Sequence, residues 1–339
     1  MRNGSSWGTL AEMRVFVATP LHHSVRQPFT FKHGLSIRKL PTILWEKAVV
    51  TGFISERDRE LLSEDRYWLT AEDDYSSISP DTGDELYDKA RRASWAFQLI
   101  HPIGGKHVFL KFSETAEGSD NLGALHPKEL NNTAWARVSA GDDQQLFACF
   151  DHVYEGVNRA FDEQIIRLQN PLILLEHGLQ LGHIYLSTMM FAMALDMLFM
   201  AGEMNNFVPR LGGFLGLDTL VLPREPYLQR QPDIKARGVL KDIYELRNIV
   251  AHGQQIPLKP YREPYTVTSV TGEYIPYEDC SYADILIECS LFILTTCLRR
   301  IMLEGMIDKV KDEDQWRQEM KLYEHRYKNA GGTYPGRKR

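Results

Sequence analysis

Two side chains with complementary chemistry lie in residues 245–253, where Arg247 precedes His252 by five positions. An arginine guanidinium carries a permanent positive charge that binds phosphate through parallel hydrogen bonds. A histidine imidazole can take up or release a proton near neutral pH. This spacing is expected about once by chance in a chain of this composition, but here the polar Asn248 follows the arginine and Gly253 follows the histidine. These residues are therefore candidates for a site that binds phosphate and transfers protons.

The element that carries the candidate residues is predicted to be an amphipathic helix over residues 232–253, opened by Pro232 and Asp233. Its core stripe is Val239, Ile243, Leu246 and Val250. At 100° per residue, Arg247 and His252 are about 140° apart, so an ideal helix does not place both on one face. The long arginine side chain can span that angle. Gly253 stops the helix and leaves His252 in its last turn, where the helix dipole favours an imidazolium.

The surrounding chain predicts two domains and an α+β fold. In residues 1–140 short β-rich runs alternate with turn residues, whereas from about residue 141 the apolar period changes from two to 3.6. We expect an N-terminal β-rich module over residues 1–140 and an all-α bundle over residues 141–330. Residues 331–339 are expected to form a basic flexible tail.

In the N-terminal module, strands are expected near residues 13–19, 29–37, 95–101 and 107–112. Gly104 and Gly105 suggest a hairpin between the last two. Residues 56–88 hold twelve acidic and three basic side chains, and are expected to form a helix followed by an exposed loop.

In the helical bundle, a first amphipathic helix from about Leu146 is expected to end before Pro171. A second, over residues 172–201, is apolar nearly all round, so we expect it at the centre of the bundle. Gly212, Gly213 and Gly216 are expected to break the chain. Two later helices are expected, one from a capping box at Ser281 and Asp284 to Gly305 or beyond, and a short one that begins at residues 312–314.

Composition and motifs exclude several functions. The net charge of −6 argues against a protein that coats nucleic acid non-specifically, although the last forty residues are basic. No P-loop, zinc-protease, nucleophile-elbow or dinucleotide-binding motif occurs. The pairs His22–His23 and His177–His183 are poorly spaced for a shared metal, so we expect no metal and no cofactor.

The chain is expected to work in the cytoplasm. Cys149, Cys280, Cys289 and Cys297 form no CxxC pair, and so are predicted to be buried free thiols. No signal peptide is visible. Residues 179–202 are long enough to span a membrane, but they contain Gln180, His183 and Asp196, so a buried helix is favoured.

The motif around Arg247 resembles that of the HEPN superfamily, and specifically the Apea-like HEPN proteins of bacterial abortive infection. Arg247, Asn248 and His252 match the family motif as R-N-x3-H, followed by the frequent Gly253. Residues 194–199, ALDMLF, are similar to the family's ALExLF-like segment, with Asp196 where the family has glutamate. An arginine of the closing helix is matched loosely by Arg299 or Arg300. The resemblance covers residues 143–310.

The resemblance implies a metal-independent endoribonuclease, in which two HEPN domains of a homodimer pair to form one composite cleft. Arg247 would bind the scissile phosphate, Asn248 would orient the histidine or the phosphate, and His252 would transfer protons to give a 2′,3′-cyclic phosphate. The resemblance also implies that the substrate is RNA, with tRNA as the first candidate, and that the protein acts in antiphage defence. A trigger, from phage or host, would act on the N-terminal module.

Other interpretations stay open at the level of sequence. Asp196 either holds the Arg247 guanidinium or is a polar residue at a helix interface. Arg237 and Lys241 either follow an RNA backbone or, with the acids near them, form a solvated mixed-charge face. The methionine-rich run over residues 189–200 is expected to be core or dimer interface. The whole bundle could also be an inactive HEPN module that binds RNA or protein, with Arg247 bridging helices and His252 satisfying a buried carbonyl.

Overall fold

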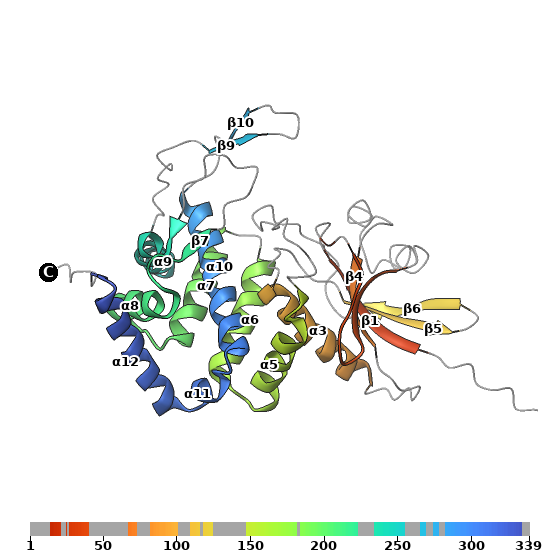
Figure 1. Ribbon diagram of the computed structural model, residues 1–339. Coiled ribbons are helices and arrows are strands. Elements are labelled where there is room, and N and C mark those ends of the chain that lie inside the picture. Colours follow the sequence, from red (N-terminus) through yellow and green to blue (C-terminus); the bar gives the residue numbers. More distant parts are fainter. Residues whose placement is uncertain are drawn as a thin grey trace, which may run out of the picture. The chain divides into compact units, whose positions relative to one another are not determined.

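The chain divides into two compact units in the computed structural model (Figure 1). Unit 1 comprises Met1–Ser94 and Lys106–Leu130, and unit 2 comprises Trp95–Gly105 and Asn131–Arg339. The structure describes residues 14–21, 25, 27–40, 67–72, 82–100, 109–115, 118–124, 147–181, 184–222, 234–254, 265–268, 274–277 and 282–333. The predicted α+β fold class is confirmed, with an antiparallel sheet near the N-terminus and mainly helices later.

Unit 1 contains a six-stranded antiparallel sheet in the order β2-β3-β4-β1-β5-β6. Its strands are β1 (Arg14–Pro20), β2 (Phe29–Thr30), β3 (Leu35–Lys39), β4 (Tyr67–Glu72), β5 (Leu110–Thr115) and β6 (Gly118–Ala124). In β1 the side chains of Phe16, Val17 and Ala18 are all buried in succession, so both faces of the central strand are covered. By contrast, Leu35 and Ile37 of β3 are buried while their neighbours are partly exposed.

Residues 29–37, expected to be one strand, form a hairpin instead. His33 and Gly34 both have positive φ angles, of 61° and 66°, which is the geometry of a tight type I′ turn. The Leu35 N–H donates to the Lys32 carbonyl across this turn at 3.2 Å. The prediction missed the turn because glycine is preceded here by histidine, rather than by the usual asparagine or aspartate.

The predicted strand at residues 95–101 is wrong, because this segment ends the helix α3 (Thr82–Ile100). Its buried side chains recur every three or four positions, at Leu86, Ala90, Ala93, Phe97 and Ile100. The alternation of Trp95, Phe97 and Leu99 imitated a strand because this end of the helix is buried on all sides. The hairpin expected at Gly104 and Gly105 lies outside the described residues. In the acidic segment the expectation is also corrected, since Tyr67–Glu72 is strand β4.

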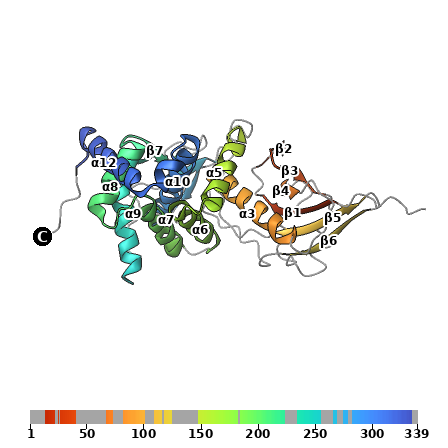
Figure 2. The same cartoon turned by 90° about the horizontal axis from the view of Figure 1, so that it is seen from below.

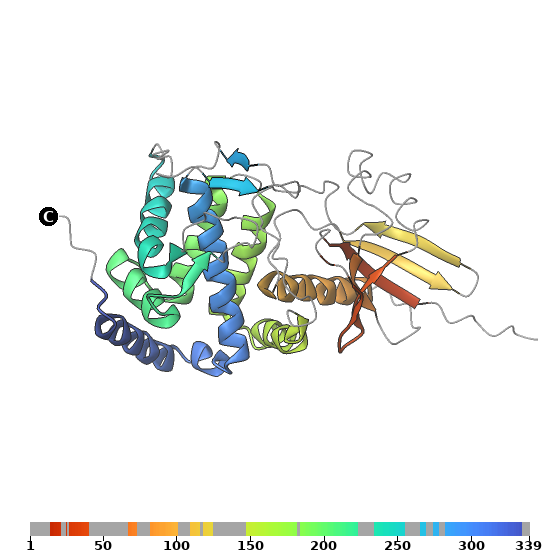
Figure 3. The same cartoon turned by 45° about the horizontal axis from the view of Figure 1, so that its top comes forward.

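Unit 2 is a helical assembly that also holds two short two-stranded sheets, so the expectation of an all-α bundle is corrected. Its helices are α5 (Phe150–Asp162), α6 (Ile166–Gln180), α7 (Ile184–Leu198), α8 (Met204–Leu215), α9 (Ala236–Ala251), α10 (Tyr282–Leu303), α11 (Ile307–Lys311) and α12 (Glu313–Asn329). The sheets pair β7 (Leu220–Leu222) with β8 (Ile234–Lys235), and β9 (Tyr265–Thr268) with β10 (Tyr274–Tyr277). Helix α10 runs beside α7 and α9, as Figures 1 and 3 show.

The end of α3 belongs to unit 2. The Trp95 indole stacks on the Phe161 ring at 4.6 Å between centroids, and its Nε1–H donates to the buried Glu176 carboxylate at 3.2 Å. Phe97 stacks on Phe147 at 5.6 Å. Residues 95–105 therefore belong to unit 2, although they precede residue 141, where the change of period suggests that the second domain begins.

The apolar segment over residues 172–201 is two helices rather than one. Helix α6 ends at Gln180 and α7 begins at Ile184, and the two pack side by side. The packing is close at Gly178, where an added Cβ would lie 2.4 Å from the Phe191 ring. Pro171 does not follow a helix end as expected but lies inside α6. There it removes one backbone N–H donor. Each helix covers apolar surface of the other, which one long helix could not do. Among the described residues, no helix is long and apolar enough to cross a membrane.

The glycines at 212 and 213 do not break the chain, because both lie inside α8. A Cβ on Gly213 would lie 1.9 Å from the Tyr323 carbonyl oxygen, and one on Gly212 would lie 2.7 Å from the Tyr327 ring. These glycines let α8 approach α12 closely, and Figure 2 shows the two helices beside each other. Gly216, with a φ of 92°, does end the helix as expected.

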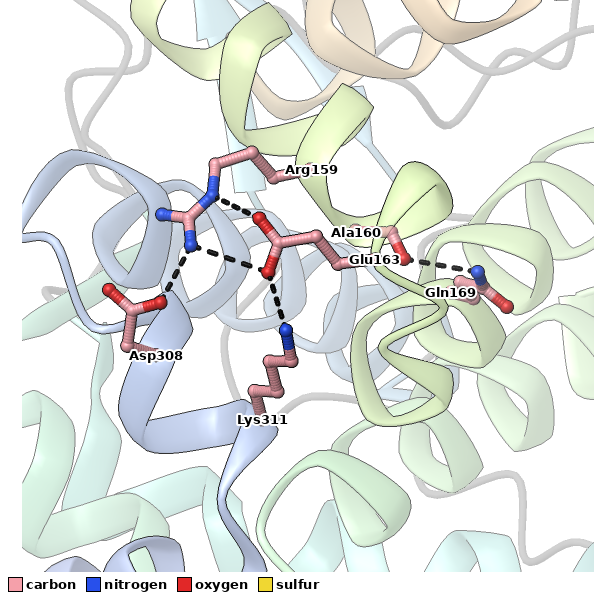
Figure 4. A network of polar contacts seen from close by, with 6 residues as sticks. All are labelled: Arg159, Ala160, Glu163, Gln169, Asp308 and Lys311. Atoms are coloured by element: carbon pink, nitrogen blue, oxygen red, sulfur yellow. Dashed lines mark hydrogen bonds and ion pairs between the residues drawn. The ribbon is translucent and has the colours of Figure 1, made fainter.

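Ion pairs join the end of α5 to α11 (Figure 4). The Arg159 guanidinium donates to Glu163 at 2.8 Å and to Asp308 at 2.6 Å, and Lys311 donates to Glu163 at 3.0 Å. Together these cations lower the pKa of the Glu163 carboxyl to about 2. Farther along, Asp312 caps α12 by accepting from two backbone N–H groups, which confirms the predicted start of that helix. The helix is not short as expected, because it runs for 17 residues.

Candidate functional site

The candidate motif lies at the C-terminal end of α9, which ends in a Schellman motif as Gly253 predicts. Gly253 has a φ of 63°, and its N–H donates to the Val250 carbonyl at 3.1 Å. The Gln254 N–H donates to the Ile249 carbonyl at 2.9 Å, which closes the motif. His252 is thereby placed at the last position of the helix, next to its negative dipole end.

Arg247 is held from three sides. Its Nη1 donates to the Asn248 side-chain oxygen at 2.8 Å, and its Nη2 lies 3.3 Å from the Asp196 carboxylate. The guanidinium carbon stands 5.4 Å from the centre of the Tyr244 ring. The side chain is 26% exposed, but Nε is buried and has no acceptor among the described residues.

Asp196 comes from α7 and connects that helix to α9. One carboxylate oxygen pairs with Arg247, while the other accepts the Gly202 N–H at 2.7 Å. The aspartate is only 14% exposed, so its pair with Arg247 is screened less than a surface pair. Of the two interpretations of Asp196, the structure agrees with the one in which its carboxylate contacts the Arg247 guanidinium.

Tyr244 is part of this site and was not predicted. It lies one turn before Arg247 on α9, and its hydroxyl donates to the Gly202 carbonyl at 3.0 Å. Burial raises the pKa of this hydroxyl, and the Asp196 charge raises it further. The sequence did contain a signal for this contact, because Tyr244 comes three residues before Arg247, a helical spacing at which a ring can pack on a guanidinium.

His252 is exposed, and its imidazole makes no hydrogen bond or ion pair with the part of the chain that the structure describes. It therefore does not satisfy a buried carbonyl, which was the alternative interpretation. Its backbone N–H donates to the Asn248 carbonyl at 3.0 Å, which places the two residues one turn apart. Because the imidazole is exposed, a ligand or a second chain can reach it.

Arg237 and Lys241 lie on α9 toward its start, away from the motif. Arg237 pairs with Asp218 at 2.7 Å, and Lys241 pairs with Glu245 at 3.7 Å. Both side chains are about half exposed. These ion pairs agree with the mixed-charge face, and the RNA contact stays a prediction.

Neither arginine of α10 lies with Arg247. Arg299 donates to the Leu99 carbonyl at 3.4 Å, and burial lowers its pKa. Arg300 pairs with Glu304 at 2.6 Å and covers the Phe214 ring. Their contacts are those of residues that hold helices together.

Metal-ligating side chains do not gather in the described residues, where no group of three or more is found. His177 is exposed on α6, while His22, His23 and His183 lie outside the described residues. Cys289 and Cys297 are buried free thiols, as expected, and Cys149 is a partly exposed free thiol. Burial raises the pKa of Cys297, so this thiol is not a ready nucleophile. Cys280 lies outside the described residues.

Comparison of the chain with protein-family models finds no match, and comparisons with curated proteins and with solved structures find none either. The chemistry of the site therefore rests on its own residues. These are a guanidinium fixed by Asp196, Asn248 and Tyr244, and an exposed imidazole one turn beyond Asn248 on the same helix end.

Proposed function

We propose that this protein is a metal-independent endoribonuclease of the HEPN type, with Arg247, Asn248 and His252 as its catalytic residues. The observation that supports the proposal is the placement of a fixed guanidinium and an exposed imidazole at one end of α9. The substrate is a cellular RNA, and tRNA is the first to examine. The protein would act in the cytoplasm as part of antiphage defence.

RNA supplies its own nucleophile, so the protein needs few groups. The 2′-oxygen attacks the adjacent phosphorus while a base takes its proton, the bond from phosphorus to the 5′-oxygen breaks, and an acid protonates that oxygen. The products are a 2′,3′-cyclic phosphate and a 5′-hydroxyl. Arg247 binds the phosphate and stabilises the charge that builds up in the transition state. The Arg247 side chain is 26% exposed, which leaves part of it open to a phosphate.

One chain supplies one His252, whereas the reaction uses a base and an acid. We therefore propose a homodimer in which each copy contributes an imidazole to the same phosphodiester. An exposed apolar side chain next to the site supports a second copy as the partner, since Met197 of α7 is 39% exposed. Met197 directly follows Asp196, which contacts the catalytic arginine.

The test is to incubate the purified protein with total cellular RNA in excess EDTA, and to map the ends of the products. We expect cleavage that survives chelation and leaves cyclic phosphates. His252→Ala should lower kcat by about 10²- to 10⁴-fold, because a proton-transfer group is lost. Arg247→Ala should lower it by about 10²- to 10³-fold, because charge stabilisation is lost.

Matched controls are available elsewhere in unit 2. His177→Ala removes an exposed imidazole from α6, and Arg317→Ala removes an exposed guanidinium that pairs with Glu313 on α12. Both controls should cleave like the wild type. Cleavage that persists in His252→Ala would overturn the mechanism. RNA binding without cleavage, at protein concentrations where the dimer is present, would favour the inactive binding module instead.

A further inference from the structure

Two residues, Asp196 and Tyr244, each contact both the Arg247 guanidinium and Gly202 in the loop after α7. Asp196 holds the guanidinium with one carboxylate oxygen and the Gly202 N–H with the other. Tyr244 lies under the guanidinium with its ring and donates its hydroxyl to the Gly202 carbonyl. Both backbone polar groups of Gly202 are thus taken up by the two side chains that hold Arg247.

Gly202 adopts the left-handed backbone conformation that this arrangement needs. Its φ is 68°, and an added Cβ would meet nothing within 4 Å, so conformation rather than space explains the glycine. The loop is fixed from its other side as well. Asn206 donates to the Ala201 carbonyl at 3.0 Å, and Arg210 donates to the carbonyls of Phe199 and Met200. Gly202 is therefore a rigid anchor for Asp196 and Tyr244.

We propose that Tyr244 is a positioning residue for Arg247, acting with Asp196 through Gly202 so that the three hold the guanidinium as one unit. The effect on RNA cleavage rests on the proposed function, whereas the clamp itself does not. Without the ring and the anchored carboxylate, the long arginine side chain would sample several rotamers, and each productive encounter with a phosphate would first have to select one of them.

The first measurement reports on Arg247 without any nuclease activity. The full-length protein is treated with phenylglyoxal, which modifies accessible guanidinium groups, and modification of Arg247 is followed by peptide mass mapping relative to the exposed Arg317. Tyr244→Leu removes the ring and the hydroxyl, and should raise the modification rate of Arg247 by about threefold to tenfold. Tyr244→Phe keeps the ring, and should raise the rate less.

A double-mutant cycle tests whether Tyr244 and Asp196 act as one unit. If Gly202 connects them, Tyr244→Phe combined with Asp196→Asn should change the Arg247 rate by clearly less than the product of the two single effects. Tyr323→Phe is the matched control, because it removes a hydroxyl from a buried ring on α12. With Asp196→Asn it should give the simple product. Multiplicative effects, within about twofold, in the Tyr244 cycle would overturn the clamp.

The second measurement uses RNA cleavage and separates positioning from folding. Tyr244→Leu should lower kcat by about tenfold with little change in KM, and Tyr244→Phe should recover part of that loss. Far-UV circular dichroism and Tm identify any variant that has not folded. A wild-type protein that cleaves no RNA would refute the proposed function, and the modification cycle would still decide the clamp. Unchanged Arg247 reactivity in both Tyr244 variants would refute the clamp, even if RNA is cleaved.

Discussion

Asp196 has two tasks that a single substitution can separate. Asp196→Asn keeps an oxygen for the Gly202 N–H but removes the charge that faces Arg247. The half-buried guanidinium then lacks its only carboxylate partner among the described residues. We expect the free energy of unfolding to fall by about 1–3 kcal/mol, measured by urea denaturation.

The control for this prediction is Asp218→Asn. It removes an exposed carboxylate, 67% accessible, that pairs with Arg237 and Lys235. Its effect should stay within about 0.5 kcal/mol, because exposed pairs contribute little. Equal effects of the two substitutions would mean that the Asp196 pair is as weak as a surface pair.

Because the pKa of Glu163 is lowered in the folded protein, we expect the free energy of unfolding to fall at acid pH. Arg159 and Lys311 lower its pKa from 4.5 to about 2. Since the folded-state pKa is depressed, this contribution is fully present above about pH 4.5 and is lost as the pH falls toward 2. Urea unfolding of the wild type and of Glu163→Gln, followed from pH 7 to pH 2, should show curves that are separated at neutral pH and converge in that window.

Salt provides a second check on the Glu163 prediction. The network is solvent-accessible, so 1 M NaCl should reduce the separation at neutral pH. A separation that is the same at pH 2 and pH 7 would show that Glu163 contributes through packing rather than through charge.

At the scale of the element, two helices end in a residue with a positive φ angle, Gly253 after α9 and Gln164 after α5. The helix α9 ends where Gly253 predicts, because glycine adopts the left-handed conformation without a steric clash. The helix α5 ends in the same hydrogen-bond pattern, but with Gln164 at a φ of 53°. The pattern was invisible in the sequence because a glutamine gives no stop signal.

Gln164→Gly should therefore stabilise the protein. An L-residue in the left-handed region costs about 1–2 kcal/mol, of which the extra chain entropy of glycine takes back part, so we expect a gain of about 0.5–1 kcal/mol. The control is Gln318→Gly, at an exposed position inside α12, which should cost about 1 kcal/mol. Urea denaturation measures both, and a loss of stability in Gln164→Gly would contradict the argument.

At the scale of the whole molecule, unit 2 contains a segment, Trp95–Gly105, that 25 residues of unit 1 separate from the rest of the unit in the chain. Trp95 and Phe97 of α3 stack on Phe161 and Phe147. The change of hydrophobic period near residue 141 marks where helices become continuous. It does not mark where the core of unit 2 begins, because a periodicity reports local structure only.

Trp95 allows this assignment to be tested. Trp95→Ala should destabilise unit 2 by about 3–5 kcal/mol, because a large buried ring is lost. Trp95→Phe keeps a ring on Phe161 but removes the donor to Glu176, and should cost about 1–3 kcal/mol. Hydrogen exchange followed by mass spectrometry should show lower protection in peptides from α5 and α6. Unchanged protection there would restore the boundary at residue 141.

The sequence alone determined the features that depend on neighbours in the chain. These are the α+β class, the helix that carries Arg247 and His252, its stop at Gly253, and the start of α12 at residues 312–314. Each follows from period, capping or glycine chemistry within one element. The resemblance of Arg247, Asn248 and His252 to a known motif also comes from the sequence alone, and it stays a prediction.

Tertiary structure decided which of these residues meet. Asp196 is 51 positions from Arg247, and Tyr244 joins the site only because α7, its following loop and α9 pack together. The same cause explains the glycines of α8, whose missing side chains matter because α12 lies against them. Contacts between distant segments depend on how apolar surfaces cover one another in three dimensions, and no local pattern encodes that.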